Sequence, residues 1–129
     1  MRKLLLVAAL AGLSACGSSG AQISLSNPNY FSAKADRKTD VMRGQFNPAR
    51  FTTAQVRKLV GSVCDGGRLS GFTTAYQDGL SAFETSCSTG FNPAIGLVEF
   101  ERSGPEVIIE ILGSDGKGNI KLQKRQTAL

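Results

Sequence analysis

The chain contains no histidine and no tryptophan, and it has three cysteines among its 129 residues. The absence of histidine excludes the Ser-His-Asp and Cys-His arrangements of nucleophilic catalysis, and every zinc site that uses an imidazole ligand. The glycine-containing stretch Gly113–Gly118 lacks the Lys-Ser/Thr ending of a phosphate-binding loop and its strand-to-helix setting. From the sequence we therefore predict neither a metal ion nor a cofactor.

The first residues have the composition of an export signal. Met1–Lys3 carries two cationic side chains, and Leu4–Leu13 is an uninterrupted run of ten apolar or small residues. A basic start followed by a short apolar segment is typical of a secretory signal peptide. Ten residues are too few to cross a bilayer as a helix.

The next cysteine stands in a recognisable setting. Leu13-Ser14-Ala15-Cys16 resembles the lipobox of bacterial lipoproteins, Leu-[Ala/Ser]-[Gly/Ala]-Cys, at all four positions. The resemblance implies that Cys16 receives a diacylglycerol and that cleavage before it removes residues 1–15 as the signal peptide. Lipoproteins of this class that stay in the inner membrane favour Asp at the next position, so Gly17 indicates the outer membrane. The alternatives are a buried N-terminal helix, or an ordinary signal peptide with a chance cysteine.

Cleavage of the signal peptide leaves 114 residues, the size of one small domain. We expect residues 16–30 to be the lipidated cysteine and a flexible tether, because Gly17–Gly20 is built from glycine and serine. Residues 31–129 then form the folded domain. The formal charge falls from +5 to +3 with the loss of Arg2 and Lys3. A solvated strand face accounts for the basic C-terminal stretch, and we predict no nucleic-acid partner for it: Lys117, Lys121, Lys124 and Arg125.

The two remaining cysteines, Cys64 and Cys87, are predicted to form a disulfide. Export delivers them to an oxidising compartment in which disulfides persist. A metal site is the alternative, but the chain offers neither histidine nor another free thiol to complete it. In the chain-entropy model a bridge that closes the loop from Cys64 to Cys87 stabilises the fold by about 3 kcal/mol.

A helix is predicted after Thr52, because Thr52-Thr53-Ala54-Gln55 has the pattern of a capping box. Phe51 and Val56 occupy the two hydrophobic-staple positions. Apolar residues then follow at helical spacing up to Cys64, and Asp65-Gly66-Gly67 ends the helix. The apolar face comprises Val56, Leu59, Val60 and Val63.

Asp78-Gly79 predicts a two-residue hairpin turn, which fixes the register of its flanking strands. The register pairs Tyr76 with Ser81, Thr74 with Phe83, Phe72 with Thr85 and Ser70 with Cys87. Cys87 then falls on the apolar face, against which the helix bearing Cys64 packs. Further strands alternate at 98–101, 107–111 and 119–123.

These elements predict an α+β fold in which one amphipathic helix packs on a four- to five-stranded antiparallel meander, with one disulfide. For residues 21–50 we expect tether, one strand at most, and irregular structure. The predicted core comprises the helix face together with Phe72, Tyr76, Phe83, Val98, Phe100 and Ile109.

Glu99, Glu101 and Glu110 are the only catalytic candidates that the pattern offers. Residues two apart on a strand project from one face, and paired carboxylates carry out glycosidic hydrolysis. The same alternation equally describes a solvated face opposite Val98 and Phe100. An enzyme acting on cell-wall glycan is therefore the alternative to a non-enzymatic function.

Residues 52–61 carry a second resemblance. Thr52-x-x-Gln55-Val56-x-x-Leu59-Val60-Gly61 is similar to the Thr-x-x-Gln-Val-x-x-Leu-Leu-Gly helix of the SmpA/OmlA family, small lipoproteins that accompany the outer-membrane β-barrel assembly machine. The resemblance implies a further alternative, an accessory function in outer-membrane protein assembly. This chain departs from the family in lacking a proline soon after Gly61, in its predicted disulfide and in its longer run of strands.

Taken together, the sequence predicts a non-enzymatic lipoprotein of the cell envelope. It is expected to be anchored through Cys16, on the periplasmic side of the outer membrane. There its domain would bind an envelope protein or glycan, or support an assembly.

We predict that Cys16 is acylated. Growth with an alkyne fatty acid should tag the wild-type protein, whereas Cys16→Ser should abolish both the tag and recovery in the membrane fraction, because the thioether to the diacylglycerol can no longer form. Mass spectrometry of the mature protein should find Cys16 as the first residue. A mature N-terminus at any other position contradicts the assignment.

Overall fold

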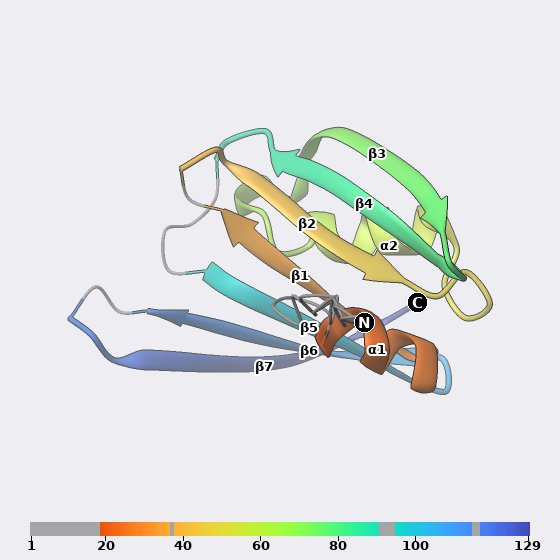
Figure 1. Ribbon diagram of the computed structural model, residues 1–129. Coiled ribbons are helices and arrows are strands. Elements are labelled where there is room, and N and C mark those ends of the chain that lie inside the picture. The colour runs from red at the N-terminus through yellow and green to blue at the C-terminus, as the bar shows by residue number, and fades with distance from the viewer. Residues whose placement is uncertain (1–18, 37, 91–94, 115–116) are drawn as a thin grey trace, which may run out of the picture.

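The computed structural model describes residues 19–36, 38–90, 95–114 and 117–129 (Figure 1). It is mostly β, with seven strands, two short α-helices and a 3-10 turn. In chain order the elements are α1 (Ser19–Ser26), β1 (Tyr30–Asp36), β2 (Val41–Phe46), α2 (Thr53–Gly61), η1 (Asp65–Gly67), β3 (Leu69–Gln77), β4 (Leu80–Cys87), β5 (Ile95–Ser103), β6 (Glu106–Ser114) and β7 (Ile120–Ala128).

All seven strands belong to one antiparallel sheet, in the order β3-β4-β2-β1-β5-β6-β7. The β1–β2 hairpin is inserted between β4 and β5, so that β2 pairs with β4 and β1 pairs with β5. Figure 1 shows the consequence: β3, β4 and β2 form one half of a curved sheet, β5, β6 and β7 form the other, and β1 joins them.

The predicted α+β fold, with one helix on a four- to five-stranded meander, is therefore wrong. The error lies in residues 21–50, which contain α1, β1 and β2 instead of irregular structure. Because β1 and β2 lie in the middle of the sheet, missing them also meant missing its topology.

Both missed strands alternate between buried and solvent-facing residues, but with small or polar side chains that weaken the pattern. In β1 the buried positions are Phe31 and Ala33, and in β2 they are Met42 and Phe46. Gly44 stands between the latter two, and glycine is unfavourable in strands. Tertiary packing overrides that weak local preference.

The face of the sheet that carries Phe31 is termed the core face here. Its centre is Phe31, whose ring stacks on Phe100 of β5 with centroids 4.4 Å apart. The same ring meets Phe51 edge-on at 4.9 Å and Phe83 at 6.2 Å. Phe31 thus connects both halves of the sheet with the segment that leads into α2. The predicted core residues belong to this cluster, with the exception of Tyr76, which is 71% exposed.

The helix α2 covers the core face and begins as predicted. The Thr52 hydroxyl accepts a hydrogen bond from the Gln55 N–H at 3.1 Å, and the Gln55 side chain accepts one from the Thr52 N–H at 3.0 Å. The helix ends at Gly61, earlier than predicted, and η1 follows with Gly66 and Gly67 at positive φ.

The Cys64–Cys87 disulfide is present, with Cα atoms 5.5 Å apart, and the prediction is confirmed. It joins the turn after α2 to the last residue of β4. The predicted hairpin register holds for its first three pairs, up to Phe72 with Thr85. A bulge at Gly71, whose φ is 64°, then shifts the register, and Leu69 rather than Ser70 lies opposite Cys87.

The other helix, α1, lies on the opposite face of the sheet, in front of it in Figure 1, whereas α2 lies behind. The Asn47 side chain donates a hydrogen bond to the Ser24 carbonyl at 3.4 Å, and Ser24 is fully buried. Leu80, which belongs to this face of β4, is only 4% exposed. The segment predicted as tether, residues 16–30, thus includes α1, which contacts β1, β2 and β4.

Gly44 allows the closest approach in the core. A Cβ there would overlap the Ser32 carbonyl oxygen of β1 and lie 2.6 Å from Cζ of Phe83. Neither group is the end of a flexible side chain, so the sheet and the aromatic cluster would both have to move.

We therefore expect Gly44→Ala to lower the free energy of unfolding by about 3 kcal/mol, at the upper end of ordinary overpacking. The measurement is the urea midpoint of the oxidised protein at unchanged m-value. Gly61→Ala is the matched control, because its Cβ would meet its nearest neighbour, the Gly67 carbonyl oxygen, at 3.4 Å. Equal midpoints for the two variants would contradict the close approach.

Candidate binding trough

The residue that the sequence assigns to lipidation, Cys16, lies outside the described residues, as does the whole predicted signal peptide. Their assignment stays a prediction. The described part of the chain contains no helix long and apolar enough to cross a membrane.

A large hollow lies on the outer face of the sheet, the face opposite the core face. Its volume is about 1170 Å³, and the term trough is used for it here. It is bordered by residues of all seven strands, which the curvature of the sheet brings around one space. They are Ser32, Lys34, Ala35, Arg43, Gly44, Gln45, Thr73, Thr74, Ala75, Ala82, Phe83, Glu84, Gly96, Leu97, Leu112, Gly113, Ser114 and Ile120.

One row of directly paired residues crosses the sheet through the trough. Directly opposite residues of antiparallel strands project from the same face, so their side chains form a continuous ladder. From β3 to β7 the row is Thr73, Glu84, Arg43, Lys34, Leu97, Leu112 and Leu122. All of these except Leu122 line the trough, and Leu122 continues the row on β7 beside it. The β3 half of the row is polar, its β7 half is apolar, and the change occurs between Lys34 and Leu97.

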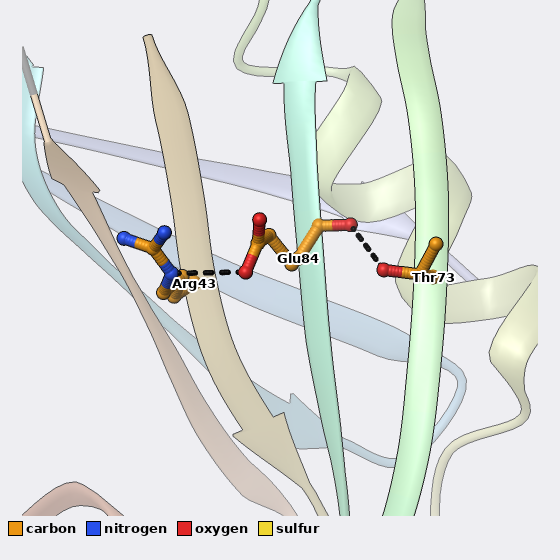
Figure 2. Close-up of polar contacts among 3 residues, drawn as sticks. All are labelled: Arg43, Thr73 and Glu84. Carbon is orange, nitrogen blue, oxygen red and sulfur yellow. Dashed lines mark hydrogen bonds and ion pairs between the residues drawn. The ribbon is translucent and has the colours of Figure 1, made fainter. Parts of the chain in front are cut away.

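The polar wall of the trough is held by an ion pair between β2 and β4 (Figure 2). Arg43 Nε lies 3.0 Å from Glu84 Oε2, and the two side chains are 54% and 53% exposed. Thr73 on β3 donates its hydroxyl to the Glu84 carbonyl oxygen at 3.4 Å. Figure 2 shows the two terminal nitrogens of Arg43 directed away from Glu84.

The apolar wall comes from β5, β6 and β7. Leu97 and Leu112 are half-buried, whereas Leu122 is 60% and Ile120 81% exposed. Large apolar side chains this exposed at one place are uncommon and mark interaction sites. Because Leu122 pairs with Leu112 and Ile120 pairs with Ser114, both side chains face the outer side of the sheet.

Backbone lies close to the surface where the trough crosses β5. Gly96 forms a bulge, since the pairing with β6 shifts between Ile95 and Leu97. A Cβ at Gly96 would lie 3.4 Å from the Leu112 carbonyl oxygen. The missing side chain leaves room above this part of the sheet.

The three predicted carboxylates share the outer face, as expected, but none of them borders the trough. Glu99 and Glu110 are directly opposite one another on β5 and β6, and both are half-buried. Each has a partner: Glu99 hydrogen-bonds to Tyr30, and Glu110 Oε1 lies 3.6 Å from Lys124 Nζ. Glu101 is exposed.

Tyr30 is perturbed by this arrangement. Burial, then the negative charge of Glu99, raise the pKa of the Tyr30 phenol above its ordinary value, and the hydrogen bond to Glu99 adds to the effect. A hydrogen bond with Ser32 opposes it. Tyr30 thus keeps its proton, and its hydroxyl group donates a hydrogen bond to the Glu99 carboxylate.

A smaller hollow of about 220 Å³ lies beside the disulfide. There Arg125 Nη2 donates a hydrogen bond to the Ser62 carbonyl oxygen at 2.8 Å, so this member of the basic stretch ties β7 to the end of α2. Among the described residues no cluster of three or more acidic or cysteine side chains could hold a metal ion.

The sequence reasoning missed the trough, although one signal for it was present. Val107–Leu112 is apolar at five of its six positions, a run that indicates a strand covered on both faces instead of one. Leu97 beside Val98 breaks the alternation of β5 in the same way. Both departures from strict alternation place apolar side chains on the outer face, where they form the apolar wall of the trough.

A scan against models of known families and searches of curated proteins and of solved structures found no match to this chain.

We expect Glu99→Gln to lower the pKa of Tyr30 part of the way to its ordinary value, because the charge is removed while the burial remains. The measurement is the ultraviolet absorbance of tyrosinate against pH, in a Tyr76→Phe background that leaves one reporter. Because the folded pKa is raised, Tyr30 contributes stability below about pH 10, which is lost as the pH rises through the folded pKa. In the variant the loss should be smaller and should be complete at lower pH, while its onset, which the unfolded-state pKa sets, stays the same.

Glu106→Gln serves as the control, since Glu106 is exposed and does not act on Tyr30. An identical titration of Tyr30 in wild type and Glu99→Gln would exclude the contact.

Proposed function

We propose that this protein is a non-enzymatic, lipid-anchored binding protein of the bacterial cell envelope, and that the trough is its binding surface. The anchor is the predicted thioether at Cys16. The observation that carries the binding role is the trough itself, a hollow of about 1170 Å³ on the side of the sheet away from α2. Ligand sites are concave and mainly apolar, with a few polar groups that orient the ligand.

The glycan-hydrolase alternative depended on paired carboxylates beside a cleft. Glu99 and Glu110 are adjacent, but their partners are Tyr30 and Lys124, and the trough does not include them. Their placement favours a binding function over hydrolysis. The accessory function in outer-membrane assembly depends on the helix resemblance, and no feature of the trough adds to it.

In-cell photocrosslinking tests the proposal. Benzoyl-phenylalanine at Ile120, which is 81% exposed in the trough, should give a discrete ultraviolet-dependent adduct in membrane fractions. The same amino acid at Arg57 of α2, exposed beyond the core face, is the control and should not give that adduct. Failure to trap any species at Ile120, or trapping of the same species at both positions, contradicts the trough as binding surface.

A further inference from the structure

We propose that the trough binds a single-chain amphiphile with one anionic head, a long-chain fatty acid carboxylate, with its chain along β5–β7 and its head at Lys34. This inference rests on the proposed function, since it names the ligand class of the same surface. The argument comes from the width of the apolar strip, the position of the Lys34 ammonium group and the side of the sheet on which α1 lies.

The apolar strip is wide enough for one chain. Its members are Leu97, Leu112, Leu122 and Ile120, contributed by three adjacent strands. The next row along the same strands is charged: Glu99, Glu110 and Lys124. A second hydrocarbon chain laid beside the first would cover those charges and remove them from water, which is costly.

The strip also has a defined length. Neighbouring strands lie about 4.8 Å apart, so Lys34 on β1 and Leu122 on β7 are separated by three spacings, about 14 Å along the sheet. An extended alkyl chain can lie across the strands over that distance, with one end at β1.

A positive charge stands at the β1 end. Lys34 is directly paired with Leu97, is exposed, and forms no ion pair with any residue that the structure describes. On its other side Arg43 engages Glu84 through Nε and turns its terminal nitrogens away from that carboxylate (Figure 2). Among the residues that line the trough Arg43 and Glu84 neutralise one another, so the unpaired charge of the lining is that of Lys34, which matches one carboxylate.

Other ligand chemistries fit less well. Sugar rings are commonly held by stacking on exposed aromatic side chains, but the aromatic residue among those lining the trough, Phe83, is 3% exposed and stacks with Phe72 in the core. A diacyl phospholipid brings two chains to a strip that accommodates one.

The helix α1, the described element nearest in sequence to the proposed anchor, lies on the same side of the sheet as the trough. The helix α1 packs on the outer face, and two residues separate Cys16 from its first residue, Ser19. Three peptide units extend at most about 11 Å, so an acylated Cys16 holds this face near the bilayer, where single-chain lipids are found.

The test is photolabelling of the full mature protein, reconstituted in phosphatidylcholine vesicles, with a long-chain fatty acid that carries a diazirine. Peptide mass spectrometry should locate adducts in β5–β7, at Leu97, Leu112 or Ile120. Lys34→Gln should reduce this labelling about tenfold, the effect of losing one charge-assisted hydrogen bond, and Lys34→Arg should retain it. Leu122→Glu should also abolish it, because it places a carboxylate in the strip.

Lys58→Gln is the matched control: it removes the same charge from exposed α2, and labelling should stay at the wild-type level. Equal urea midpoints would show that all variants are folded. The proposal is overturned by adducts that avoid β5–β7, by equal labelling of Lys34→Gln and wild type, or by equal labelling with a diazirine fatty alcohol. Equally strong trough labelling by diazirine phosphatidylglycerol overturns the single-chain assignment.

The same digest separates this inference from the proposed anchor. Acylation of Cys16 is read from the N-terminal peptide, and ligand binding is read from β5–β7. An unmodified N-terminal peptide contradicts the anchor and leaves the ligand assignment intact. Trough peptides without adducts contradict the ligand assignment and leave the anchor intact.

Discussion

The pairing of β1 with both β2 and β5 is the contact on which the rest of the structure depends. Without it the chain would contain two separate three-stranded sheets, β2–β4–β3 and β5–β6–β7, and the core face would be divided between them. Phe31 on β1 completes this junction on the core face by stacking on Phe100 and meeting Phe83. On the outer face the same strand places Lys34 between the polar and apolar halves of the trough. Fold and candidate site therefore depend on one strand.

Local sequence signals predicted those features that are themselves local. The Thr52–Gln55 capping box, the turn at Asp78-Gly79 and the inward faces of β5 and β6 all follow from residues a few positions apart. The disulfide followed from the predicted export together with those local elements. Each was predictable because a short pattern of residue types at fixed spacing, such as a capping box or an Asp-Gly turn, is compatible with few local structures.

The centre of the sheet was not predictable in this way. β1 is specified mainly by its partners, because Phe31 pairs with Phe100, a residue far from it in the sequence. Ala33 and Gly44, which lie opposite one another, are small because the strands and the Phe83 ring approach closely there, and small residues carry little strand preference. The trough was missed for a related reason: it arises from curvature across seven strands, and no single strand encodes it.

The sheet is open, so β3 and β7 leave unpaired backbone groups along two edges. Such edges pair with strands of other molecules and lead to aggregation unless charged side chains, bulges or covering elements prevent the pairing. On β7 positive charge opposes edge pairing, because the strand is exposed along most of its length and carries Lys121, Lys124 and Arg125. The bulge at Gly71 interrupts the regularity of β3. If the proposed anchor confines copies to a membrane surface, their exposed edges meet in two dimensions, and like charges on β7 would keep neighbouring sheets from joining into a ribbon.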